Sequence, residues 1–191
     1  MTASNRLLIV LASGSPRRKE ILDLMGLPYT VDVSQADESF DGAPRDMVLE
    51  LSRRKAEAVA ARHERALVLA ADTTVCDEER ILGKPGTPER ARAMLRELSG
   101  KWHSVFTGMT LINTQTGKAI SRAEETRVHF VEMTPEEIEA YIATGEPLDK
   151  AGAYGIQGQG GMFIDRIEGD YSCVVGLPMA LLRGMLMEMD A

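Results

Sequence analysis

A single stretch near the start of the chain, LLIVLASGSPRRKEIL at residues 7–22, constrains the fold most strongly. Its apolar run predicts a buried strand, and Ser-Gly-Ser-Pro then predicts a short loop leading into a helix, because proline is favoured in the first helical turn. Arg17, Arg18 and Lys19 fall in that turn. Cations at a helix N-terminus oppose the helix dipole, so the cluster indicates a bound anion such as a phosphate chain. Three solvated basic residues are the simpler interpretation, and motifs further along the chain decide between the two.

The charge balance limits the classes of partner. The chain has 191 residues, with 22 Lys and Arg against 29 Asp and Glu, and a net charge of −7. An acidic protein has no sequence-independent affinity for nucleic acid, so we expect no nucleic-acid partner. The length fits a single domain over residues 1–191. No apolar run is long enough to cross a membrane and no signal-peptide pattern precedes the first strand, which predicts no membrane partner and a cytoplasmic location.

The cysteines and histidines do not suggest catalytic or metal sites. Cys76 and Cys173 lie far apart in apolar segments and lack zinc-ligand spacing, so we expect buried free thiols. His63, His103 and His129 are scattered and suggest no triad; we expect structural or surface roles.

Two further segments place polar residues where an apolar pattern leaves them unexplained. Residues 44–63 have the period of a long helix, with Lys55 in line with the apolar stripe. Its ammonium must either extend to the edge of the stripe or meet an anion. Residues 66–76 predict a central strand that Asp72 interrupts. Because an unpaired carboxylate in a core is costly, Asp72 must lie at an open end of the strand or be held by cations or a metal.

The remaining pattern predicts a mixed α/β sheet with flanking helices. We expect strands at residues 29–33, 102–114 and 119–133, the last two forming a hairpin, and short strands at 161–167 and 171–175. Helices are predicted at 88–98, from Thr134 to about Gly145, where a capping box begins the helix, and at 178–189. The Met-rich face of the final helix fits core packing together with a homodimer contact.

The unexplained polar residues together suggest phosphoryl chemistry. Clustered cations suit a triphosphate, and two carboxylates suit a divalent metal held jointly with substrate phosphates. A P-loop is ruled out because GxxxxGK[ST] does not occur. The late GIQGQGG segment is glycine-dense but opens no evident helix, so it carries little weight as a dinucleotide-binding fingerprint.

Six motifs in order give the chain a resemblance to a known family. These are LASGSPRRKEIL, ADES, LSRRKA, LAADTTV, ILGKP and EPLDKAGAYGIQG. The chain resembles the Maf family of nucleoside triphosphate pyrophosphatases over nearly its whole length. The resemblance implies two lobes around a cleft, as in the inosine triphosphate pyrophosphatases, and cleavage between the α- and β-phosphates with a divalent cation, Mg²⁺ or Mn²⁺.

The resemblance also assigns roles to particular residues. It implies that Asp72 is the proton acceptor and that Glu38 is the second acidic group near the metal. The positions it implies for substrate binding are Ser13, Arg17, Arg18, Lys55 and Lys84. Arg17, Thr73 and Gln157 match the branch of the family that acts on dTTP and UTP, and modified pyrimidine triphosphates are further candidates. The amide of Gln157 can donate to and accept from the O4/N3 edge of a pyrimidine.

Two alternatives stay open at this point. The same pocket could serve a nucleotide-binding regulator, for example of cell division, that binds dTTP without turnover. The enzyme could also act on 7-methyl-GTP or on a broad range of bases, although Gln157 argues against this.

Overall fold

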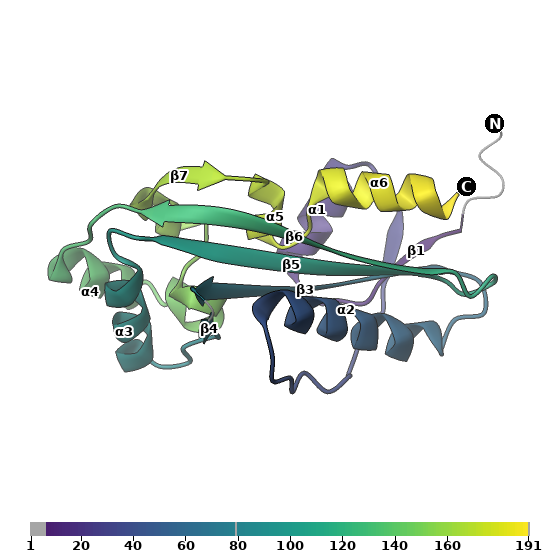
Figure 1. Cartoon of the computed structure of the whole chain (residues 1–191), viewed down its shortest axis with the longest axis horizontal. Coiled ribbons are helices and arrows are strands. Elements are labelled where there is room, and N and C mark those ends of the chain that lie inside the picture. Colours follow the sequence, from purple (N-terminus) through teal and green to yellow (C-terminus); the bar gives the residue numbers. More distant parts are fainter. Residues whose placement is uncertain (1–6, 79, 191) are drawn as a thin grey trace.

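The computed structural model describes residues 7–78 and 80–190. Its centre is a twisted, mixed sheet of seven strands in the order β2-β1-β3-β5-β6-β7, with β4 also paired to β3 (Figure 1). β1 pairs in parallel with β2 and β3, and every later pairing is antiparallel. The strands are β1 (Ile9–Leu11), β2 (Tyr29–Val31), β3 (Leu67–Asp77), β4 (Arg80–Leu82), β5 (Trp102–Asn113), β6 (Ala119–Phe130) and β7 (Ile164–Glu168).

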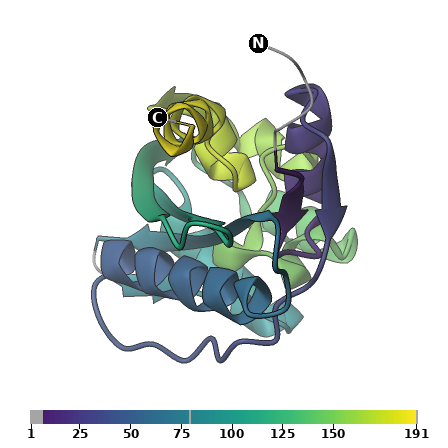
Figure 2. The same cartoon turned by 90° about the vertical axis from the view of Figure 1, so that its right-hand side faces the viewer.

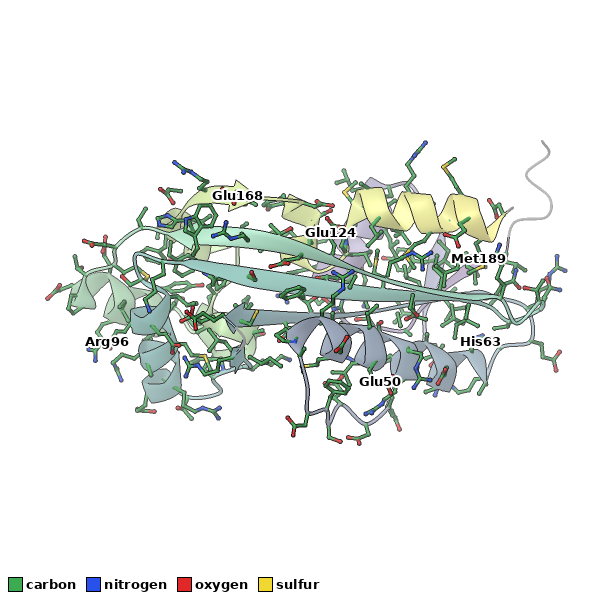
Figure 3. The ribbon with its side chains drawn as sticks, in the orientation of Figure 1. Glu50, His63, Arg96, Glu124, Glu168 and Met189 are labelled. Atoms are coloured by element: carbon green, nitrogen blue, oxygen red, sulfur yellow. The ribbon has the colours of Figure 1, made fainter. Side chains whose placement is uncertain are left out.

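Helices cover both faces of this sheet. Helix α2 packs along one face, and α1, α5 and α6 lie on the other, while α3 and α4 sit at the far end of the β5–β6 hairpin (Figures 1 and 2). Figure 3 shows Glu50 on α2 and Met189 on α6 on opposite sides of the sheet. The helices are α1 (Pro16–Leu24), α2 (Pro44–Ala60), α3 (Pro88–Leu98), α4 (Pro135–Ala143), α5 (Tyr171–Val175) and α6 (Met179–Met189), with 3₁₀ turns at Glu146–Asp149, Ala151–Ala153 and Gln159–Phe163.

Local sequence explains where these helices begin. Helices α1, α2, α3 and α4 all carry proline in the first turn, where its missing N–H costs no hydrogen bond. At α4 the predicted capping box is present: the Thr134 side chain accepts from Glu137 N–H, and the Glu137 carboxylate accepts from Thr134 N–H. Side-chain caps therefore satisfy free backbone donors at the starts of α3 and α4, whereas α1 and α2 begin with proline and have no side-chain cap.

Separate apolar clusters build two lobes. One cluster packs α1 and α6 against the parallel part of the sheet and includes Leu11, Leu69 and Leu182. A second packs α3, α4 and the 3₁₀ turns around the far end of the hairpin and includes Leu95 and Phe130. Because the two clusters lie toward opposite ends of the long strands, the surface between them is left open.

The pairing of β3 leaves a gap in the sheet between the lobes. β1 pairs with Leu67–Leu69 and β4 pairs with Val75–Asp77, on the side of β3 away from β5. Among the described residues, no strand pairs with residues 70–74 on that side. Asp72 lies in this gap, in the middle of β3 and not at an open end of it, so of the predicted arrangements the structure shows the one in which a cation holds the carboxylate.

One predicted element is wrong, and several boundaries shift. Tyr171–Val175 is a helix rather than a strand, because the Asp170 side chain caps it by accepting from Ser172 N–H and Gly176 ends it at φ 116°. These caps override the strand preference of Tyr and Val. Residues 161–163 belong to a 3₁₀ turn, so β7 begins only at Ile164. The long helix ends at Ala60 and the second long strand at Phe130, both earlier than predicted.

The predictions for cysteine and histidine agree with the structure. Cys76 and Cys173 are buried free thiols, and burial raises the pKa of each to about 11. His63 and His129 pair with surface carboxylates, and His103 is buried. In the described part of the chain, no helix is long and apolar enough to span a membrane.

Candidate active site

A cleft of about 620 Å³ lies between the two lobes, beside the gap in β3. It brings together residues that are far apart in the sequence, from the β1–α1 loop, α2, β3, the turn after β4 and the 3₁₀ segment. All but one of the predicted site residues line it, namely Ser13, Arg17, Arg18, Glu38, Lys55, Asp72, Thr73 and Lys84. The positive side chains predicted from position 17 to position 84 therefore meet in one cleft with Asp72.

Asp72 is held by Lys55 at the floor of the cleft. The distance from Lys55 Nζ to Asp72 Oδ1 is 2.6 Å, and the same Nζ lies 2.8 Å from Glu38 Oε1. Lys55 and Asp72 are each only 12% exposed, whereas Glu38 is 66% exposed on the rim. Lys55 thus meets anions instead of extending along the apolar stripe, and it keeps the Asp72 carboxylate paired despite its burial.

A close approach of α2 to the sheet makes this pairing possible. Gly108 on β5 lies directly opposite Asp72 on β3. A Cβ atom at Gly108 would come within 2.3 Å of the backbone oxygen of Val48 on α2. Only glycine therefore lets α2 lie near enough for Lys55 to reach Asp72. The sequence pattern gave no indication of this role.

Arg18, in the first turn of α1, is held by hydrogen bonds within the protein. Arg18 turns inward and donates to Ser13 Oγ, Thr73 Oγ1 and the Gly176 carbonyl oxygen. Burial lowers the pKa of Arg18, and the charge of Asp72 partly offsets that effect. Ser13 Oγ accepts from both Arg18 and the Ser15 N–H, so its own hydroxyl proton remains available to a ligand.

Arg17 and Lys84 line the cleft without a fixed partner among the described residues. Neither side chain makes a hydrogen bond or ion pair with any other residue that the structure describes, although both line the cleft. Lys150 lines it too, donating to the Glu146 carbonyl oxygen and to Asp149 Oδ1. Lys150 lies within the motif EPLDKAGAYGIQG, and Asp149 also lines the cleft, so this pair leaves the net charge of the predicted lining residues unchanged.

Gln157 is the one predicted site residue that does not line the cleft. It is exposed, but the neighbouring Gly155 and Ile156 are lining residues. The Glu146 carboxylate organises this loop by accepting from the Tyr141 hydroxyl and from the N–H groups of residues 159 and 160. Burial alone would raise the pKa of Glu146, but these hydrogen bonds lower it overall. Gln157 is therefore carried on an ordered loop beside the cleft.

The acidic residues fit a divalent cation. Glu38 and Asp72 converge on one ammonium, so the three groups together carry a net charge of −1. No cluster of three or more His, Cys, Asp or Glu side chains suited to a metal occurs within residues 7–78 and 80–190. A cation held here would need further oxygen ligands, as Mg²⁺ takes from substrate phosphates and water.

Comparison with known proteins identifies relatives that match nearly the whole chain. The chain is 50% identical over 184 residues to a dTTP/UTP pyrophosphatase of Bacillus cytotoxicus, covering 95% of each chain. Proteins with the same description from Bacillus mycoides and Bacillus cereus are each 49% identical, over 96% and 95% of both chains. The family model described as "Maf-like protein" matches residues 8–189. The resemblance suggested by the six motifs is confirmed: the chain belongs to the Maf family.

Proposed function

We propose that the protein hydrolyses dTTP and UTP between the α- and β-phosphates, releasing the nucleoside monophosphate and pyrophosphate. The observation that carries the proposal is the meeting of Arg17, Arg18, Lys55 and Lys84 with Asp72 in one cleft. A triphosphate needs several cations around it, and hydrolysis needs a carboxylate within reach of an attacking water. The relatives described as dTTP/UTP pyrophosphatases, with about half their residues identical, support the same substrates.

The phosphate chain would lie along the N-terminus of α1. The Ser13 hydroxyl has a free proton to donate, and Arg17 and Lys84 have charges that no other described residue neutralises. Backbone N–H groups at the start of a helix favour the same ligand. These groups can stabilise the negative charge that grows on pyrophosphate as it leaves.

Asp72 is the proposed proton acceptor. Lys55 holds Oδ1, and Oδ2 makes no hydrogen bond with a described residue. A water beside Oδ2 can attack the α-phosphorus while its proton moves to the carboxylate. As the new P–O bond forms, the bond to the bridging oxygen breaks, and its electron pair leaves with pyrophosphate.

Glu38 and Asp72 are the proposed ligands of Mg²⁺ or Mn²⁺. A divalent cation at this place would neutralise phosphate charge and lower the pKa of bound water. Gln157 is the proposed reader of the base, through hydrogen bonds to the O4/N3 edge, with Arg17 and Thr73 as further determinants of specificity.

The proposal also covers the domain organisation, the location and the oligomeric state of the protein. We propose that residues 1–191 act as one domain in the cytoplasm, where both buried thiols would stay reduced. A homodimer is also proposed, through the Met-rich final helix, on which Met187 is 59% exposed.

Product analysis over a panel of nucleotides tests the activity. We expect monophosphate plus pyrophosphate from dTTP and UTP with Mg²⁺ or Mn²⁺, and much slower turnover of purine triphosphates, including 7-methyl-GTP. Diphosphate plus phosphate as products would contradict the proposed cleavage position. Tight dTTP binding without turnover under either metal would instead indicate a regulator.

A further inference from the structure

Three contacts from different parts of the chain fix the guanidinium of Arg18. Nε donates to the Gly176 carbonyl oxygen at 2.9 Å, Nη1 to Ser13 Oγ at 3.0 Å and Nη2 to Thr73 Oγ1 at 3.2 Å. A guanidinium has five N–H donors, so two remain for a bound anion. Because the group is planar and rigid, the three contacts also set the direction of the two remaining donors.

The contact with Thr73 continues into the sheet through Thr107. The two threonines oppose each other on β3 and β5, and their Oγ1 atoms are 2.9 Å apart. Thr107 Oγ1 donates to the Cys173 carbonyl oxygen at 2.8 Å, and a carbonyl can only accept. The single hydroxyl proton of Thr107 is therefore committed, so Thr107 must accept from Thr73. The chain of donors runs from Arg18 through both threonines to Cys173.

We infer that Thr107 is a positioning residue of the active site, which fixes the Arg18 guanidinium through the hydroxyl of Thr73. The inference rests on the proposed function, in which Arg18 binds phosphate. Thr107 is fully buried and is not a lining residue of the cleft, so it reaches a ligand only through other residues. Thr73 donates its only hydroxyl proton to Thr107, so it has none to donate to a pyrimidine. Its second lone pair can still accept from a pyrimidine N–H, whereas its effect on bound phosphate passes through Arg18.

The turn at the end of α5 completes this network. Gly176 adopts φ 116°, and a Cβ atom there would lie 3.1 Å from Thr73 Oγ1. Helix α5 supplies one carbonyl acceptor, that of Cys173, and its C-cap residue Gly176 supplies the other. The end of α5 is therefore hydrogen-bonded both to Arg18 in the first turn of α1 and to Thr107, which contacts Thr73 in the middle of β3.

A pair of substitutions tests the inference. Thr107→Val keeps the shape of the side chain and removes the hydroxyl, whereas Thr107→Ser keeps the hydroxyl. We expect Thr107→Val to weaken binding of inorganic triphosphate, and to lower kcat/KM for dTTP, UTP and CTP by the same factor, about tenfold. Thr107→Ser should restore both quantities to within about twofold of the unmodified protein.

Thr110→Val is the matched control. Thr110 is also fully buried on β5, but its hydroxyl contacts Ser52 and Ser121 on the face toward α2. We expect it to lower the thermal midpoint, as Thr107→Val does, without weakening triphosphate binding. In an Arg18→Lys background, Thr107→Val should cause no additional loss, because its effect passes through the guanidinium.

Two results would overturn the inference: inorganic triphosphate binding to Thr107→Val at the affinity of the unmodified protein, or a full additional loss in the Arg18→Lys background. Failure of the proposed function is distinguishable from either result. An unmodified protein that binds inorganic triphosphate but hydrolyses no nucleotide would contradict the activity, and the binding comparison would still test the role of Thr107.

Discussion

Lys55 Nζ lies 2.6 Å from Asp72 Oδ1, and each of these two side chains is only 12% exposed. The pair joins α2 to β3 at the floor of the cleft. Burial removes most of the solvent that would otherwise weaken the attraction between the two charges. The contact therefore both fixes the carboxylate and leaves its second oxygen facing the cleft.

Asp72→Asn should nearly abolish turnover, while dTTP binding measured without a divalent cation should be retained. The amide keeps the shape of the side chain but cannot accept a proton from water, so we expect kcat to fall by about 100-fold or more. Pyrophosphate release and dTTP binding measure the two effects. Asp165→Asn, at an exposed carboxylate paired with His129, is the control and should retain normal kcat. Full activity in Asp72→Asn would remove Asp72 from the proposed role.

Lys84→Gln should raise KM without destabilising the fold. Lys84 pairs with no other residue in the described ranges, so its removal breaks no ion pair, and the free energy of unfolding should change by less than about 0.5 kcal/mol. Loss of one phosphate contact should raise KM for dTTP about tenfold. Lys101→Gln, at a 57% exposed side chain, is the control. An unchanged KM in Lys84→Gln would place the phosphate chain elsewhere.

Gly108→Ala should destabilise the protein through a single added methyl group. The new Cβ would overlap the Val48 backbone oxygen, so α2 must move away from the sheet at a cost of about 1–3 kcal/mol. Activity per folded molecule should also fall, because Lys55 moves with α2. Gly184→Ala on α6 meets nothing within 4 Å and should stabilise the helix by about 0.5–1 kcal/mol. Chemical denaturation compares the two variants, and equal effects would contradict the close approach.

His103 should make stability fall at acidic pH. Burial lowers the pKa of His103 from 6.5 to about 4. The unfolded chain therefore binds more protons than the folded protein between these values. The neutral, buried His103 therefore contributes to the free energy of unfolding fully above pH 6.5, and this contribution is lost as the pH falls toward 4. The loss is on the order of 3 kcal/mol.

His103→Gln tests that pH dependence. Glutamine does not titrate, so denaturation curves between pH 7 and pH 4 should show a shallower loss of stability in the variant than in the unmodified protein. Equal slopes would show that His103 does not titrate differently in the folded and unfolded states.

Local sequence determined most of the secondary structure, and it indicated most of the residues that line the candidate site. Proline and capping residues mark where helices such as α1 and α4 begin, and apolar runs mark β1 and β3, because these signals act over a few neighbouring residues. Ordered motifs likewise identified Arg17, Lys55, Asp72 and Lys84 as candidates. The helix at Tyr171–Val175 was missed because its caps outweigh the strand preference of its apolar residues.

Only the tertiary structure decided how these residues act together. The gap in β3 arises because β1 and β4 pair with different parts of that strand. The approach of α2 depends on Gly108, which is opposite Asp72 in the sheet but 36 positions away along the chain. The link from Arg18 through Thr73 to Thr107 likewise joins three distant segments. Sequence patterns report local preference and burial, whereas these relationships depend on strand register and helix packing between segments far apart in the chain.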